Sequence, residues 1–418
     1  MTAAGNLVAT YLRALGNLNR DVRLFMVSVA VSGICYMGLY FLLINLYLLR
    51  LGYGLEFIGA FVSTGAFSFA LFSLPAGMVG RRWGSRRPMI FGMAVLSLGL
   101  AMLALAALVP ASWRSVWLIF FCAFRELGNS FYLVNSNPYL MQVITPAERD
   151  YAFSVRSTLT PLASFFGTLG GGWLPTVSAY FLGRPIDDPL NYMVPLLLSS
   201  ILLLPGLVAL SMTREVAQVG AEKVPRERGA MPLELLITIA VVSLLFIVAA
   251  SAGQSFYNVY MDTVLKAPTQ LIGSMASCGQ LLSVVLMLAA PALMERWGHA
   301  RTFVLIALGM GLSILPMALV PHWLPAGLSI VMVMTLMTLS STALTIFHQE
   351  LVPAAWRPAM SGASLMAMGI GWGIVSLGGG YFIAAWGWSP FFLVAAGMTV
   401  LGAVVFWTRF LWSGSRSL

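Results

Sequence analysis

Long apolar stretches recur along the whole chain and dominate its pattern of hydrophobic and polar positions. They lie at 24–49, 56–80, 88–109, 115–143, 151–181, 191–212, 232–264, 269–294, 302–320, 323–349, 358–384 and 388–411. A helix of more than about 18 apolar residues can cross a bilayer, whereas barrel strands would alternate apolar and polar residues over about ten positions. Because these stretches are continuous, the pattern predicts an all-α integral membrane protein with twelve transmembrane helices.

The composition supports this class. Hydrophobic residues make up 59% of the chain and charged residues only 9%, against about a quarter in soluble domains. Cys35, Cys122 and Cys278 lie in apolar segments, and the three histidines are scattered. We therefore expect no disulfide framework, no metal site and no cofactor. No nucleotide-binding motif is recognisable either, so an enzyme or a nucleotide-driven motor is not expected.

The basic residues predict the orientation in the membrane. With both termini inside, the outer loops contain only Arg50, Arg114, Arg184 and Lys266, and nearly all the others are cytoplasmic. This asymmetry follows the positive-inside rule and favours an N-in/C-in arrangement. It also accounts for the net charge of +9 without a nucleic-acid partner. Residues 1–23 are predicted to include a short amphipathic helix on the cytoplasmic surface.

Four short segments repeat in the same order along the chain, which indicates a duplication. Residues 45–48 recur at 258–261, 81–87 at 295–301, 142–146 at 349–353, and 170–172 at 378–380. The longest polar stretch separates the two copies. We therefore divide the chain into an N-terminal six-helix half (1–213), a cytoplasmic linker (214–231) and a C-terminal six-helix half (232–418). A site between such halves can face either side by rocking.

One of these repeated loops resembles the signature of the major facilitator superfamily, G-x-x-x-D-R-x-G-R-R/K. Here it consists of Gly77, Arg81, Arg82, Gly84, Arg86 and Arg87, and its second copy consists of Glu295, Arg296, Gly298 and Arg301. The resemblance implies the twelve-helix fold of that family and a loop that clamps the cytoplasmic side. Arg81 replaces the acidic residue of the signature, which puts the first clamp in question.

Polar residues concentrate in spans 1, 4, 7 and 10. Such side chains must face protein or a water-filled cavity, and the family places its cavity on the same helices. The candidate cavity residues are Tyr36, Tyr40, Asn45, Asn129, Gln254, Asn258 and Thr342. For Asn45 and Asn258, pairing between the halves or helix capping is an equal alternative. For the two tyrosines, packing is the alternative to an aromatic substrate wall.

Arg125 and Glu126 are charged residues within a predicted span. We expect Glu126 to bind and release a proton, with Arg125 tuning it or anchoring an anionic or polar substrate group. The alternative is a structural ion pair or network that holds span 4 to a neighbour, because adjacent residues on a helix diverge and need not pair with each other. Asp262 is expected to be solvated or to pair with Lys266.

These features predict a secondary transporter that moves a small molecule by alternating access. Proton coupling is expected because no nucleotide site is visible. A partial match to the span-5 pattern of superfamily antiporters leans weakly towards export. An uptake carrier and a non-transporting membrane sensor or assembly factor are the alternatives. The expected partners are the lipid bilayer, the substrate and protons, and we expect a monomer in a bacterial inner membrane.

Overall fold

The computed structural model describes residues 19–145, 149–214, 233–351 and 357–412. These residues are predominantly helical, which confirms the predicted all-α class. The first helix group consists of α2 (Arg20–Ser32), η1 (Gly33–Tyr40), α3 (Phe41–Arg50), α4 (Leu55–Trp83), α5 (Arg86–Ala104), η2 (Leu105–Leu108), α6 (Ala111–Val143), α7 (Arg149–Leu182), α8 (Pro189–Leu202) and α9 (Leu204–Ser211). The predicted amphipathic helix before residue 19, and nearly all of the linker, lie outside the described residues.

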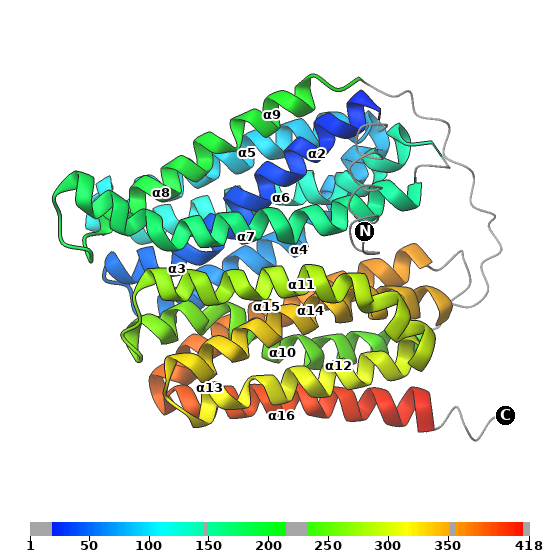
Figure 1. The fold of residues 1–418 in the computed structure, drawn as a ribbon. Coiled ribbons are helices and arrows are strands. Elements are labelled where there is room, and N and C mark those ends of the chain that lie inside the picture. Colours follow the sequence, from blue (N-terminus) through cyan, green and yellow to red (C-terminus); the bar gives the residue numbers. More distant parts are fainter. Residues whose placement is uncertain (1–18, 146–148, 215–232, 352–356, 413–418) are drawn as a thin grey trace, which may run out of the picture.

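The second helix group follows the linker. It consists of α10 (Leu233–Thr263), α11 (Thr269–Trp297), α12 (His299–Ser313), α13 (Leu315–Leu319), α14 (Trp323–Leu351), α15 (Arg357–Trp386), α16 (Trp388–Phe406) and η5 (Trp407–Trp412). The helices of both groups run roughly along one direction, with α2–α9 on one side of the molecule and α10–α16 on the other (Figure 1). This arrangement supports the proposed division into two halves.

Each predicted apolar segment corresponds to one helix or to consecutive helices in the described chain. Within the described ranges, ten helical segments are long and apolar enough to cross a membrane. Helices α6 and α7 are not among them. In α6 the hydropathy is lowered by Arg114, Arg125 and Glu126 together with several asparagines. Length alone would allow both helices to span, so we keep them as predicted spans.

The most extensive contacts between the groups are those of α4 with α15 and of α7 with α11, and α3 also contacts α10. Small residues allow these contacts. A Cβ atom on Gly59 would lie 2.4 Å from the backbone oxygen of Ser376, and one on Gly273 would lie 2.8 Å from the Cα atom of Gly172. Backbones that approach this closely can slide with few interlocking side chains. Closely packed glycines therefore lie at the boundary between the groups.

The repeated loop has the same backbone geometry in both groups. Helices α4 and α11 each contain 29 residues and each end on tryptophan. The following glycine has φ 83° and ψ 155° at Gly84, and φ 75° and ψ 158° at Gly298. Glycine adopts a positive φ without the penalty of a side chain. The matching conformation supports the duplication inferred from the sequence.

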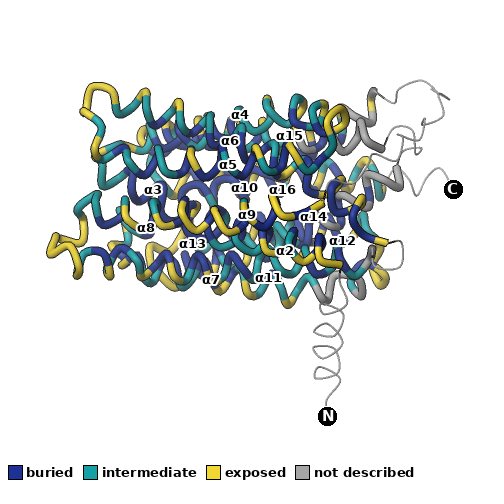
Figure 2. Tube along the Cα trace, turned by 90° about the horizontal axis from the view of Figure 1, so that it is seen from above, coloured by how far each residue is buried: buried dark blue, intermediate teal, exposed yellow. Residues whose placement is uncertain are grey.

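The bundle has two distinct ends. We call the end where α4, α9, α11 and α16 finish the linker end, and the opposite end, where α3 finishes and α8 begins, the far end (Figure 1). Buried residues run along the middle of the bundle, and exposed ones gather on its outer faces and loops (Figure 2). At the far end Asp188 caps α8 by accepting a hydrogen bond from the backbone N–H of Leu190 at 2.9 Å.

Candidate functional site

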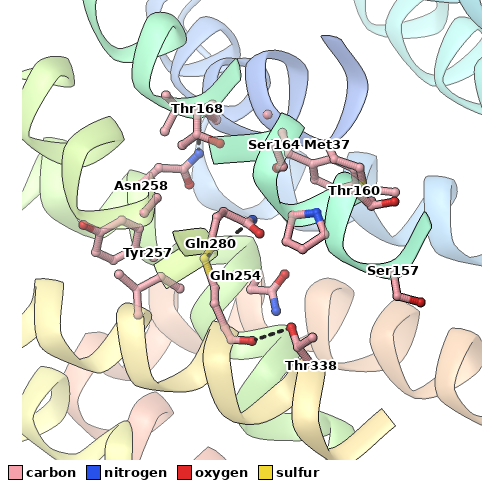
Figure 3. A pocket seen from close by; sticks show the side chains of 17 residues that line it. Met37, Ser157, Thr160, Ser164, Thr168, Gln254, Tyr257, Asn258, Gln280 and Thr338 are labelled. Carbon is pink, nitrogen blue, oxygen red and sulfur yellow. Dashed lines mark hydrogen bonds between the residues drawn. The ribbon is translucent and has the colours of Figure 1, made fainter. Parts of the chain in front are cut away.

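A cavity of about 320 Å³ lies between the two helix groups. The first group contributes η1, α3 and α7, and the second contributes α10, α11 and α14 (Figure 3). Its size is within the range of small-molecule sites. The lining residues are Met37, Gly38, Phe41, Leu42, Ser157, Thr160, Pro161, Ser164, Thr168, Gln254, Tyr257, Asn258, Ala276, Gln280, Ile330, Met334 and Thr338.

The lining of this cavity combines polar and apolar side chains and carries no formal charge. On one side, hydroxyl groups follow α7, and on the other side the amides of Gln254 and Gln280 face them (Figure 3). Two buried hydroxyl groups, Ser164 Oγ and Tyr257 Oη, have no hydrogen-bond partner among the described residues. An unpaired polar group in a buried position is costly and calls for a partner. The cavity wall therefore contains unpaired hydroxyl groups from both helix groups.

Two reciprocal hydrogen bonds join the helix groups beside the cavity, on the side toward the far end. Asn45 Nδ2 donates to the backbone oxygen of Ser255 at 2.8 Å, and Asn258 Nδ2 donates to that of Leu42 at 2.9 Å. The two asparagines occupy matching positions of the repeat. Of the two interpretations made from the sequence, pairing between the halves is the one this geometry supports. Asn258 also lines the cavity, whereas Asn45 does not.

An ion pair lies further toward the far end and joins the same helices. Arg50 on α3 donates two hydrogen bonds to Asp262 on α10, at 2.8 and 2.6 Å. Asp187 lies 3.0 Å from Arg50 Nε. The expectation that Asp262 would be solvated or paired with Lys266 is wrong. Arg50 is 212 residues away in sequence, but folding brings it closer to the carboxylate. By contrast with this paired far end, the cavity-lining residue Ser157, on the linker-end side, is exposed.

Arg125 and Glu126 form a buried cluster inside the first helix group, with exposed fractions of 3% and 5%. Arg125 Nη2 contacts Glu126 Oε1 at 2.5 Å, so these adjacent residues do pair. Arg125 Nη1 donates to the Tyr36 hydroxyl at 2.5 Å, and that hydroxyl donates to Glu126 at 3.1 Å. Asn129 donates to the second carboxylate oxygen at 2.8 Å. Both oxygens of Glu126 are therefore hydrogen-bonded.

Aromatic rings complete this cluster. The guanidinium carbon of Arg125 lies 5.1 Å from the ring centre of Tyr36 and 4.5 Å from that of Tyr40. Such cation–π contacts stabilise a desolvated arginine. A Cβ atom on Gly65 of α4 would lie 3.4 Å from both Arg125 Nη2 and Glu126 Oε1, so a larger side chain there would crowd the pair. The packing interpretation of the two tyrosines fits this geometry better than a substrate wall.

The π-helix η1 separates the ion cluster from the cavity. Tyr36 and Tyr40 contact Arg125, while Met37 and Gly38 line the cavity. Single π-helical turns often occur at functional sites, because they are strained relative to the α-helix. Gly38 packs against Gly167 on α7, where an added Cβ atom would approach to 2.7 Å. One short segment thus touches both sites.

The predicted cavity residues therefore separate into two sets. Gln254 and Asn258 line the cavity, and Tyr36, Tyr40 and Asn129 belong to the ion cluster instead. The side chain of Thr342 lies outside the described residues. The prediction that spans 1, 4, 7 and 10 would form the lining missed α7 and α11 and included α6, which contributes no residue to this cavity. The hydroxyls of α7 were a weak signal, because serine and threonine also bond within their own helix, as Thr160 does with Arg156.

The loop motif lies at the linker end. Arg86 donates to the Thr213 hydroxyl at 3.1 Å and to the backbone oxygen of Ser211 at 2.6 Å. This anchors the first copy to α9, within its own helix group. Arg81 and Arg82 are exposed, as are Glu295, Arg296 and Arg301 in the second copy. The role of these residues as a clamp stays a prediction.

Comparison with known proteins identifies the fold. Residues 25–376 match the family model of the Major Facilitator Superfamily. A structure of a mutant of the nucleoside transporter NupG aligns with a TM-score of 0.74 at 16% identity, covering 94% of this chain and 100% of that one. A POT family transporter in complex with 5-aminolevulinic acid aligns with a TM-score of 0.75 at 15% identity, covering 93% and 96%.

A D-xylose-proton symporter gives a TM-score of 0.71 at 15% identity, covering 93% of this chain and 97% of that one. No curated protein sequence matches the chain. At these identities the structural similarity concerns the fold alone. The family match extends over most of the chain, and this multi-pass membrane protein therefore belongs to the major facilitator superfamily.

Proposed function

We propose that this major facilitator superfamily protein is a proton-coupled secondary transporter of a small, neutral, polar molecule. The observation that carries the proposal is the uncharged cavity between the helix groups, with the free hydroxyl groups of Ser164 and Tyr257 on opposite walls. A charged substrate would lose its hydration there without gaining an opposite charge. A neutral molecule with hydroxyl or amide groups would satisfy the free groups.

The substrate is held by both helix groups at once. Ser164 belongs to α7, while Tyr257 and Gln254 belong to α10. A ligand that bridges them favours conformations in which the two groups are close together. Opening toward either side would then require the groups to rock about the α4–α15 and α7–α11 contacts, whose small residues permit sliding.

Glu126 is the proposed proton carrier. Protonation would remove its charge, weaken the contact with Arg125 and release the hydrogen bond from Tyr36. Tyr36 is the sequence neighbour of Met37 and lies in the same π-helix, η1. A change in the ion cluster can therefore alter the cavity wall through η1. This is the physical link that coupling between proton and substrate requires.

The similar structures support the choice of substrate class only in outline. Their names include a nucleoside transporter and a D-xylose-proton symporter, and nucleosides and pentoses are neutral polar molecules. The direction we propose is export, which rests on the span-5 sequence pattern. Transport measured in inside-out and right-side-out vesicles tests that direction separately.

Thermal unfolding of the purified protein tests substrate recognition. Uridine and D-xylose serve as neutral polar probes, and benzoate and tetraphenylphosphonium as charged probes of each sign. At a hundredfold excess over its dissociation constant, a ligand specific for the folded state adds about 2.7 kcal/mol of stability. We expect stabilisation only by neutral compounds, and its loss in Ser164→Ala and Tyr257→Phe. Stabilisation by a charged probe alone would contradict the neutral-substrate proposal.

Proteoliposomes with an imposed pH gradient test proton coupling. We expect the wild type to accumulate the stabilising probe against its concentration gradient, and Glu126→Gln to lose accumulation but retain exchange. Glu234→Gln is the matched control, because Glu234 forms an exposed ion pair with Arg409. Gradient-driven accumulation by Glu126→Gln would remove Glu126 from the mechanism. Ligand binding without any flux would favour the sensor alternative.

A further inference from the structure

A second cavity, of about 420 Å³, lies at the linker end on the outside of the second helix group. It is formed by the start of α12 and by η5, which follows α16 directly and packs against α12. Its lining residues are Arg301, Val304, Leu305, Trp407, Leu411 and Trp412. None of them lines the cavity between the helix groups, so this pocket is independent of the proposed transport site.

Arg301 supplies the charge of this pocket. The loop motif predicted it to be a gate residue, but the structure places it against η5, away from the first helix group. Its side chain is exposed, and no described residue pairs with it. Arg301 also lies in the first turn of α12, where the helix dipole favours anions. The pocket thus offers an unneutralised positive charge to an anionic group.

The remaining walls are apolar and aromatic. Trp407 and Trp412 stack with their ring centres 6.1 Å apart, and both are about half exposed. Leu305 and Leu411 continue the surface along the helices. Tryptophan is enriched where lipid headgroups meet acyl chains. A charge at one edge and an apolar surface beside it match a molecule with an anionic head and a hydrocarbon tail.

We propose that this pocket binds one anionic phospholipid of the leaflet at the linker end. Arg301 contacts the phosphate, the two tryptophans pack against the glycerol region, and Leu305 and Leu411 contact an acyl chain. Basic pockets on helices at the cytoplasmic side bind anionic headgroups by the same chemistry. The occupant is a lipid because the pocket faces outward from the bundle and most of its lining is apolar.

Native mass spectrometry of the full chain in detergent, titrated with phosphatidylglycerol or phosphatidylcholine, tests this site. We expect tighter binding of phosphatidylglycerol. Arg301→Gln should weaken it about fivefold, because one basic residue near an anionic surface contributes about 1 kcal/mol. Arg82→Gln is the matched control, since Arg82 is an exposed arginine at the same end but outside the pocket. It should leave the affinity unchanged.

Three outcomes would overturn the proposal. Equal weakening by Arg301→Gln and Arg82→Gln would indicate a general charge effect. Equal affinity for the two lipids would exclude recognition of net charge. Displacement of phosphatidylglycerol by millimolar inorganic phosphate would indicate a simple anion site. Trp407→Ala provides a second variant: we expect weaker lipid binding with Arg301 intact, and unchanged binding would remove the aromatic wall from the site.

Discussion

The ion cluster inside the first helix group and the cavity between the groups differ in the hydrogen bonding of the polar groups to which we assign a function. Both oxygens of Glu126 are hydrogen-bonded by neighbours from α6 and η1. In the cavity, the hydroxyls of Ser164 and Tyr257 find no partner among the described residues. A carboxylate with both oxygens bonded is held in one arrangement, although Arg125 Nε and Tyr40 Oη of the same cluster have no hydrogen-bond partner among the described residues.

This difference assigns separate tasks to the two sites. Among the described residues, the buried charged side chains Asp21, Arg125 and Glu126 all lie in the first helix group, and none of them lines the cavity. The cavity itself stays neutral and is shared by both halves. Among the described residues, η1 contacts both sites, and so does Phe41 at the start of α3, whose ring packs against Tyr36 and Tyr40 and lines the cavity. We therefore expect substrate binding and proton binding to influence each other through this stretch of the chain.

The largest expected effect comes from breaking the ion cluster. Arg125→Ala leaves Glu126 as a buried charge without its partner, which costs about 3–5 kcal/mol. We expect a large drop in thermal stability or in the yield of folded protein. The double variant Arg125→Met with Glu126→Leu removes both charges and should recover most of the stability while abolishing gradient-driven transport. A stable Arg125→Ala protein would show that the cluster is accessible to water.

An intermediate effect is expected from the ion pair at the far end. Asp262→Ala removes the carboxylate that accepts two hydrogen bonds from Arg50. The loss of a charge-assisted hydrogen bond costs about 1–3 kcal/mol, which shifts the equilibrium between joined and separated helix groups at the far end about five- to 150-fold. We expect faster maleimide labelling from the far side of a cysteine introduced at Thr168, which lines the cavity. The background carries Cys278→Ser, because Cys278 is exposed.

Asp187→Ala is the control for this experiment. Asp187 contacts the same arginine, but its side chain is 74% exposed, against 11% for Asp262. Exposed ion pairs contribute little because water screens them. We expect its labelling rate to stay close to that of the parent. Equal acceleration by both variants would mean that net charge at the far end, not the ion pair, keeps the groups together.

The smallest effect separates the two matching asparagines. Asn45→Ala and Asn258→Ala each remove one hydrogen bond between the groups, which contributes about 1 kcal/mol. Both should accelerate labelling from the far side several-fold. Only Asn258→Ala should also weaken binding of the stabilising probe, because Asn258 lines the cavity and Asn45 does not. An equal loss of affinity in both variants would mean that Asn45 also belongs to the binding site.

The helices could be predicted because the apolar composition of each segment is sufficient by itself to indicate a helix buried in lipid. Matching residues also predicted the repeat, and the shared backbone of Gly84 and Gly298 agrees with it. Contacts that depend on how two helices pack together were harder to predict from the sequence. The pairing of Asp262 with Arg50 joins residues far apart in the chain, and nothing in the spacing along α10 indicates it.

The ion cluster and the cavity show the same limit of prediction from the sequence. Counting polar residues identified α6 and α10, but it could not distinguish a side chain that faces the cavity from one that faces its own helix group. Asn129 and Gln254 look alike in sequence, yet one bonds to Glu126 and the other lines the cavity. The direction of a side chain depends on how the helix is rotated within the bundle, which composition does not determine.

The polarity of α6 has a consequence for biosynthesis. A charged residue at the centre of an isolated helix costs about 2.5–3.5 kcal/mol on insertion into a bilayer, and α6 contains two adjacent ones. Its partners η1, α4 and α5 precede it in the chain and leave the ribosome first. We expect α6 to leave the translocon together with these helices, with Tyr36 available to the charged pair. The order of synthesis would then determine whether this helix enters the membrane at all.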